Sequence, residues 1–291
     1  MDKALPTSSS QIRRAARRGL VLYLAVVVIL SAPLQTGVIL THAFQDQTTS
    51  IFWMTALMST PALASVVARL ARQESFSDVS FRLGGRPGRR ALSYAVALPF
   101  LIGSAAYGCA WLTGLVGSHT PALPQWAGLL VAMLVVNVFL CFGEELGWRG
   151  YMVTRLVDAG VPAPLLVSAL IWGVWHVPLI LWGGFVEDSP SSTFSTLMLL
   201  GTTTSLGYVL ARLRMDTGSV WPPYALHVVW NVVIQVGFDP WVIGTASVVW
   251  VGEFGLLTVA ALTVAALLHA RRPGPADLSQ PAVADVSRAA A

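Results

Sequence analysis

Long apolar runs dominate the chain, and short segments that carry most of the charge separate them. A helix needs roughly 20 predominantly apolar residues to cross the hydrocarbon core of a bilayer. Eight segments satisfy this requirement, and they are residues 20–41, 51–71, 91–116, 126–146, 163–183, 194–213, 218–236 and 243–270. The pattern therefore predicts an all-α polytopic bundle of about eight transmembrane helices, with 20–270 as one membrane domain.

The composition also indicates a membrane protein. Hydrophobic residues make up 55% of the chain and charged residues 11%, whereas about a quarter of the residues of a soluble domain are charged. The mean hydropathy is +0.67. Although the formal net charge is +4, the basic residues are dispersed and form no continuous basic face, which excludes a nucleic-acid partner. The expected surrounding is a lipid bilayer.

Lysine and arginine predict the orientation of the spans, because short cytoplasmic loops collect them. If the N-terminus is cytoplasmic, the inside segments contain all 18 basic residues and the outside loops contain only acidic ones. We therefore predict that both termini are cytoplasmic, with a basic segment at 1–19 and a disordered tail at 271–291. Lys3 is the single lysine, and this bias towards arginine is typical of a GC-rich genome and suggests a bacterial cell membrane.

A charged motif stands at the end of the fourth predicted span. Ionisable groups inside a membrane cost several kcal/mol unless they are paired or hydrated, so each one suggests a function. Glu145 and Arg149 are spaced i, i+4 with the acid first, which favours a structural ion pair on one helix. Glu144 projects about 100° away from Glu145. This geometry leaves Glu144 available as a base.

Two further polar motifs lie in other spans. His176 is in the middle of the fifth span beside Trp172 and Trp175, which we expect to form a pocket wall. His227 and Asn231 lie in the seventh span, where the i, i+4 spacing places them on one helical face. Each motif alone is also compatible with an interfacial aromatic belt or with hydrogen bonding between helices.

Depth in the membrane determines whether these motifs can meet. If the fourth span continues as a helix and turns near Gly160, Glu144 and His176 are each 16 residues from the turn. At a rise of 1.5 Å per residue, an antiparallel hairpin puts both at roughly the same height. His227 in the seventh span lies at a height in the membrane comparable to that of Glu144 and His176. We therefore expect one polar cavity that contains Glu144, His176, His227 and Asn231.

Such a group of side chains could hydrolyse an amide. A desolvated glutamate is a competent general base for water, and His176 could orient that water. His227 and Asn231 could donate hydrogen bonds to the oxyanion of a tetrahedral intermediate. Alternatively, His176 and His227 with Glu144 or Glu145 match the His₂Glu ligand set of catalytic zinc. A zinc cofactor and a metal-free glutamate mechanism both remain open.

The same motifs resemble those of the CPBP family, which comprises CAAX proteases and bacteriocin-processing enzymes and is also called the Abi family. Its pattern is EExxxR, FxxxH and HxxxN on separate membrane helices. The matching residues here are Glu144, Glu145, Arg149, Trp172, His176, His227 and Asn231, with tryptophan where the family often has phenylalanine. The resemblance implies an intramembrane endopeptidase of the metalloprotease type or with a metal-free mechanism. Its substrates would be peptides or lipidated proteins, either prenylated or of the bacteriocin type.

Two other functions are compatible with the sequence. Transporters and proton-coupled carriers also bury ionisable residues, but the chain shows no inverted repeat of the kind that many transporters have. A proteolytically silent scaffold or bacteriocin-immunity protein would retain the same polar positions. Glu253 in the last predicted span is more readily explained by a polar partner or a cavity lining than by catalysis.

Overall fold

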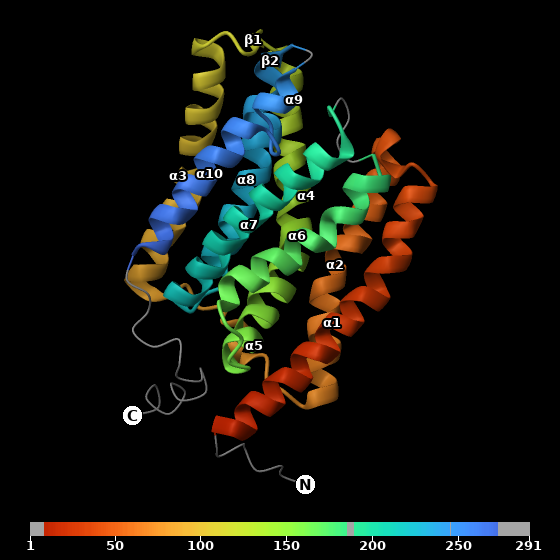
Figure 1. Cartoon of the computed structure of the whole chain (residues 1–291), viewed down its shortest axis with the longest axis vertical. Helices are drawn as coiled ribbons and strands as arrows, with labels where there is room; N and C mark the ends of the chain where they lie inside the picture. Colours follow the sequence, from red (N-terminus) through yellow and green to blue (C-terminus); the bar gives the residue numbers. More distant parts are fainter. Residues whose placement is uncertain (1–8, 185–188, 245, 273–291) are drawn as a thin grey trace.

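The computed structural model describes residues 9–184, 189–244 and 246–272, except the side chains of residues 47 and 48. Within these residues the fold is an all-α bundle (Figure 1). The sheet found in these residues consists of two short strands, β1 (Gly117–Ser118) and β2 (Val242–Ile243), which pair antiparallel. Most of the predicted tail 271–291 and part of the predicted basic segment 1–19 lie outside the described residues.

The helices follow the predicted order of apolar runs. The α-helices are α1 (Ser9–Leu40), α2 (Gln47–Arg72), α3 (Gly85–Leu112), α4 (Leu123–Gly147), α5 (Val153–Asp158), α6 (Pro164–Trp182), α7 (Ser192–Thr217), α8 (Trp221–Val232), α9 (Ser247–Trp250) and α10 (Leu256–Ala270). Two π-helical segments, η3 (Trp148–Met152) and η4 (Val233–Phe238), continue α4 and α8. Short 3₁₀ turns are η1 (Ala43–Gln45), η2 (Ser77–Val79) and η5 (Asp239–Trp241).

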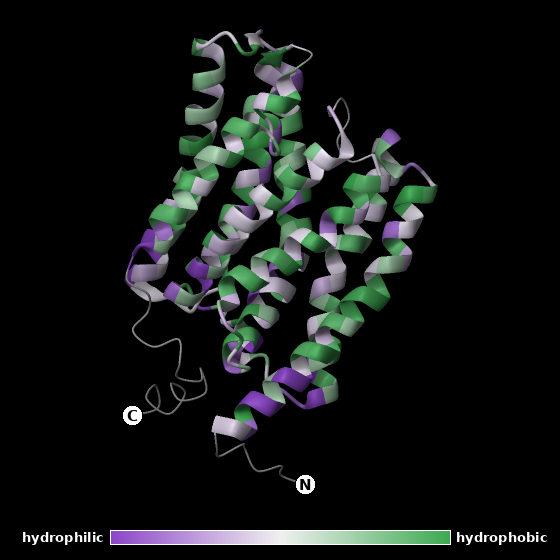
Figure 2. Ribbon diagram, viewed as in Figure 1, coloured by the Kyte–Doolittle hydropathy of each residue, from purple (hydrophilic) through white to green (hydrophobic). Residues whose placement is uncertain are grey.

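Six described helices are long and apolar enough to cross a membrane. They are α1, α2, α3, α6, α7 and the continuous helix Leu123–Asp158, which comprises α4, η3 and α5. Figure 2 shows apolar residues along most of these helices and hydrophilic residues gathered near the start of α1 and around α5. The predicted class, an all-α polytopic membrane bundle, is therefore confirmed, and the protein is a multi-pass membrane protein.

The last two predicted spans have different boundaries from those that we expected. The seventh segment, 218–236, is helical from Trp221 but changes to π-helix at Val233. The eighth, 243–270, is not one continuous helix, because α10 begins only at Leu256. Gly252 adopts a φ of 87°, a left-handed conformation, in the non-helical segment between α9 and α10. Glycine reaches this region without the steric cost that a side chain would add.

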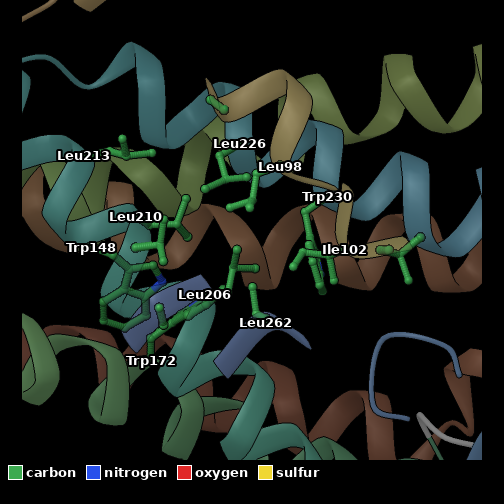
Figure 3. Close-up of a cluster of buried hydrophobic side chains, with 14 of the residues drawn as sticks. Leu98, Ile102, Trp148, Trp172, Leu206, Leu210, Leu213, Leu226, Trp230 and Leu262 are labelled. Carbon is green, nitrogen blue, oxygen red and sulfur yellow. The ribbon is translucent and has the colours of Figure 1, made fainter. Parts of the chain in front are cut away.

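In the view of Figure 1, α4 lies behind α6 and α7. It contacts α2 on one side and α8 on another, while α6 packs against α7 and α3 packs against α8 and α10. Figure 3 shows the buried apolar side chains that join these elements, including Trp148, Trp172, Leu206 and Trp230. This core fixes the relative positions of α4, α6 and α8, the helices that carry the three polar motifs.

Two glycines bring α4 unusually close to α2. A Cβ added at Gly147 would lie 2.4 Å from the carbonyl carbon of Pro61, and one added at Gly143 would lie 2.6 Å from the carbonyl oxygen of Met58. Any larger residue would force the two backbones apart. These glycines flank Glu144 and Glu145, so the close approach fixes the position of the acidic pair against α2.

Candidate active site

The helix that carries the acidic pair changes its hydrogen-bonding pattern just after it. Glu144 and Glu145 lie in the last turn of α4, and the π-helical segment η3 begins at Trp148. Single π-turns inside α-helices are frequent at functional sites. The helix then continues through α5 to Asp158, and Gly160 adopts a φ of 68° at the turn into α6. This hairpin brings Glu144 and the fifth predicted span together.

Glu144 is completely buried and is held through one of its two oxygens. Its Oε2 accepts hydrogen bonds from the indole Nε1 of Trp172 at 2.6 Å and of Trp148 at 3.2 Å. Its Oε1 is buried and has no hydrogen-bond partner in the described structure. An unpaired buried acceptor costs about 1–3 kcal/mol and calls for an explanation. The carboxylate is thus oriented by two donors while its second oxygen remains available to a ligand.

Trp172 is central to this arrangement. Besides its hydrogen bond to Glu144, its ring meets the His227 ring edge-on, with centroids 5.2 Å apart. The Arg149 guanidinium lies 4.6 Å from the centroid of the Trp172 ring, a cation–π distance. A phenylalanine, which often stands here in the CPBP pattern, would keep the ring contacts but could not donate to Glu144.

Glu145 forms an ion pair with two partners. Its Oε1 lies 2.7 Å from NH1 of Arg149 and 2.9 Å from Nδ1 of His227. All three side chains are buried, with at most 4% of their surface exposed. The structure therefore places His227 beside Glu145, with its Nδ1 occupied. Only the opposite ring nitrogen, Nε2, can face a reacting group.

His176 lies on α6 and is partly buried. Its Nδ1 is 2.9 Å from the backbone oxygen of Trp172. A carbonyl can only accept, so Nδ1 carries the proton and the Nε2 of the neutral ring is an acceptor. The ring stands edge-on to Trp175, with centroids 4.7 Å apart. Trp175 itself donates from Nε1 to Ser31 of α1 at 2.8 Å, so its indole nitrogen is turned towards α1.

Asn231 has a partner that the sequence motifs do not include. Its Nδ2 donates to Oδ1 of Asn137 at 2.8 Å and lies 3.6 Å from Sγ of Cys141. Asn137 in turn donates to the carbonyl of Met133. The signal in the sequence was an asparagine inside an apolar run, two helical turns before Glu144. The polar face of α8 therefore lies along the polar face of α4.

The residues considered for zinc do not assemble into a metal site. In the described part of the chain no group of three or more His, Cys, Asp or Glu side chains is placed to hold a metal ion. Nδ1 of His176 and of His227 and Oε2 of Glu144 are each bound within the protein, which leaves Nε2 of each histidine and Oε1 of Glu144 as the possible ligand atoms. In this arrangement the three side chains are not grouped as a zinc site.

Glu253 belongs to a separate polar group next to the site. It lies in the non-helical segment between α9 and α10, and its carboxylate accepts hydrogen bonds from Trp230 at 3.2 Å and from Gln235 at 2.9 Å. Each oxygen therefore has a donor, in contrast to Glu144. This observation is in accord with the view of Glu253 as a side chain with polar partners.

Comparison with known proteins gives a family for the part of the chain that carries the site. No curated protein matches the chain. Residues 126–233 match the family described as type II CAAX prenyl endopeptidase Rce1-like. The matched segment runs from α4 to the end of α8 and includes all seven motif residues from Glu144 to Asn231. The resemblance that the motifs indicated is therefore confirmed as a match to the Rce1-like family model over residues 126–233.

Proposed function

We propose that this protein is an intramembrane endopeptidase that hydrolyses a peptide bond in a membrane-associated substrate. The observation that carries the proposal is the state of Glu144. Its carboxylate is buried and fixed by two indole donors, and one oxygen is left without a partner. A general base needs such a free lone pair within reach of a water molecule. The family match over the same helices supports this assignment.

Glu144 would take a proton from water through Oε1 as the water oxygen bonds to the scissile carbonyl carbon. Nε2 of His176, as an acceptor, would hold the second hydrogen of that water. Collapse of the tetrahedral intermediate then breaks the C–N bond, and Glu144 returns its proton to the leaving nitrogen. No step in this sequence requires another co-reactant.

Asn231 and His227 would stabilise the intermediate. Nδ2 of Asn231 donates to Asn137 and, at 3.6 Å, to Sγ of Cys141, and it would exchange the weak bond to sulfur for one to the oxyanion. His227 in its imidazolium form would donate through Nε2, since Nδ1 faces Glu145. A fixed donor of this kind is worth on the order of 3 kcal/mol in the transition state. Glu145 and Arg149 would position His227 and neutralise each other beside the base.

The family description suggests the substrate class. CAAX prenyl endopeptidases are named for prenylated peptides, and an apolar chain in the bilayer would deliver such a peptide to a site between helices. The distribution of arginine predicts that the site faces the cytoplasmic leaflet. A peptide without a lipid, as in bacteriocin processing, is the second candidate substrate.

The proposal is tested with the purified full-length protein in lipid nanodiscs and a quenched fluorescent peptide, with and without a farnesyl group. We expect the wild type to cleave and Glu144→Gln, which keeps size and removes the base, to lose nearly all turnover. Glu253→Gln is the matched control, because it neutralises another glutamate that is held by hydrogen bonds, and it should keep turnover within about threefold. Cleavage by Glu144→Gln at a rate near that of the wild type would exclude Glu144 as the base.

A further inference from the structure

Two buried arginines from other helices bind the backbone of η3, the π-helical segment directly after the acidic pair. NH2 of Arg69 on α2 donates to the carbonyl of Gly150 at 2.9 Å. Nε of Arg214 on α7 donates to the carbonyl of Arg149 at 3.1 Å. Arg69 is 0% exposed and Arg214 is 4% exposed. Neither arginine belongs to a motif, and the sequence pattern counted both only among the basic residues on the cytoplasmic side.

One acidic residue ties the two arginines together. Asp78 lies in η2, within the loop between α2 and α3. Its carboxylate pairs with NH1 of Arg69, and its backbone carbonyl accepts a hydrogen bond from NH2 of Arg214. We call Arg69, Arg214 and Asp78 the guanidinium clamp. It joins α2, α7 and the η2 loop across η3.

The clamp acts on the part of the helix that is least able to hold its own shape. In η3 the hydrogen bonds run from i to i+5, as in the bond from the Val153 N–H to the Trp148 carbonyl. This pattern is rare, and it appears as isolated turns inside α-helices. A π-helical turn contains one residue more than an α-helical turn. If η3 returned to the α-helical pattern, the chain after η3 would therefore rotate by about 100° relative to α4. The hairpin of α5 and α6, which carries Trp172 and His176, would then turn relative to Glu144.

Guanidinium groups are well suited to prevent this change. Hydrogen bonds from a charged donor are roughly twice as strong as those between neutral groups. The rigid fork of arginine can also bind two acceptors at once, as Arg214 does with the carbonyls of Arg149 and Asp78. Bonds from outside the helix favour carbonyls that are tilted out of its hydrogen-bond ladder, and the carbonyls of Arg149 and Gly150 in η3 both receive such bonds.

We propose that Arg69 and Arg214 are positioning residues for the peptidase reaction, which hold η3 in its π-helical form and thereby fix the α5–α6 hairpin, with Trp172 and His176, relative to Glu144. This inference rests on the proposed function. Through Asp78, the η2 loop would also influence the geometry of the active site, although the loop itself does not enter the site. Neither arginine touches the substrate in this scheme.

Arg214→Gln is the main test, because both acceptors of Arg214 named here are backbone carbonyls and the substitution leaves neither Arg69 nor Asp78 without its ion-pair partner. A displacement of about 1 Å in a catalytic group can cost about 10²-fold in rate. We expect kcat to fall roughly 10- to 100-fold while KM stays within about threefold. Arg214→Lys keeps the charge and can reach one carbonyl, so it should recover part of kcat. If Arg214→Gln does not fold, Arg214→Lys is the variant whose kcat is compared with that of the wild type.

Arg155→Gln is the matched control. Arg155 belongs to the same network, with ion pairs to Glu74 and Asp78 at 2.8 Å each, but it bonds to neither of the two η3 carbonyls that the clamp holds. It should lower the thermal stability about as much as Arg214→Gln and leave kcat within about threefold. If both variants lower kcat in proportion to their loss of thermal stability, the clamp is a structural staple only and the proposal is overturned. An unchanged kcat in Arg214→Gln overturns it as well.

Hydrogen exchange gives a second measurement that does not depend on cleavage. Amides of residues 148–153 should exchange faster in Arg214→Gln than in the wild type or in Arg155→Gln, since η3 would lose an external bond. Equal exchange in all three proteins would refute the clamp. If the wild type cleaves no peptide but exchange in η3 still rises in Arg214→Gln, the proposed function fails while the hold on η3 stands.

Discussion

Arg149→Met probes the buried ion pair that supports His227. The substitution keeps an apolar side chain of similar length over the Trp172 ring and removes the charge. Glu145 and Arg149 are 1% and 0% exposed, and their charged atoms are 2.7 Å apart. Breaking a buried pair by removing one partner typically costs about 3–5 kcal/mol, because a charge is left without compensation. We therefore expect a loss of several kcal/mol in the free energy of unfolding.

The second partner of Glu145 bears on how large that loss is. Nδ1 of His227 lies 2.9 Å from the same oxygen, so Glu145 keeps one hydrogen bond when Arg149 is replaced. This bond should bring the cost towards the lower limit, about 3 kcal/mol. Adding Glu145→Gln to Arg149→Met removes the uncompensated charge. The double variant should therefore be more stable than Arg149→Met alone, and its loss of stability should be about 1–3 kcal/mol smaller than the summed losses of the two single variants.

The free energies are measured by equilibrium unfolding of the four proteins of this cycle in mixed micelles. Arg212→Met is a suitable control, because Arg212 also forms an i, i+4 ion pair, with Asp216 at 2.7 Å, but the acid of that pair is 31% exposed. A pair with a hydrated carboxylate should cost clearly less to break. If Arg149→Met loses less than about 1 kcal/mol, or if the double variant is less stable than Arg149→Met, the account of a desolvated pair is wrong.

Three further outcomes are expected. Asn137→Ala removes the acceptor that orients Asn231, so kcat in the peptide assay should fall about 10-fold or more while KM stays nearly constant; an unchanged kcat would separate Asn137 from the site. Tyr23→Phe deletes a fully buried hydroxyl that has no hydrogen-bond partner in the described structure. Thermal unfolding should therefore show unchanged stability or a gain of up to about 1 kcal/mol. A clear loss of stability would contradict this expectation. Burial raises the pKa of Asp239 to about 6. The hydrogen bond from Tyr107 lowers this pKa, and the negative charge of Glu253 raises it further. The folded state therefore binds the extra proton, so stability should decline as the pH rises from about 4 to about 6 and should then level off; Asp239→Asn should flatten this slope.

The hydrophobic pattern was sufficient to predict the class of fold and most of the spans. A run of 20 apolar residues has few alternatives to a membrane helix, so α1, α2, α3, α4, α6 and α7 could be located from length and composition alone. The start of α10 could not, because it depends on the backbone of Gly252, and a glycine in an apolar run is compatible with a continuous helix. The orientation of the bundle remains a prediction.

Parts of the site depended on local geometry that the sequence does not show. An ideal helix predicts the Glu145–Arg149 pair from its spacing, but the π-helical turn that follows has no residue signature. His227 lies beside Glu145 rather than in contact with the proposed base, and which of two adjacent acids faces α8 depends on helix rotation. Arg69 and Arg214 counted only as loop charges by the positive-inside rule, whereas the structure buries both.

The glycine contact between α4 and α2 restricts how a polypeptide could approach Glu144. At Gly143 and Gly147 the two backbones are so close that even a methyl group could not fit between them. An extended peptide is far wider than a methyl group, so it could not slip between α4 and α2 without prising the two helices apart. The side of the proposed site that faces α2 is therefore closed to a peptide, and a substrate would have to approach Glu144 from another side of α4.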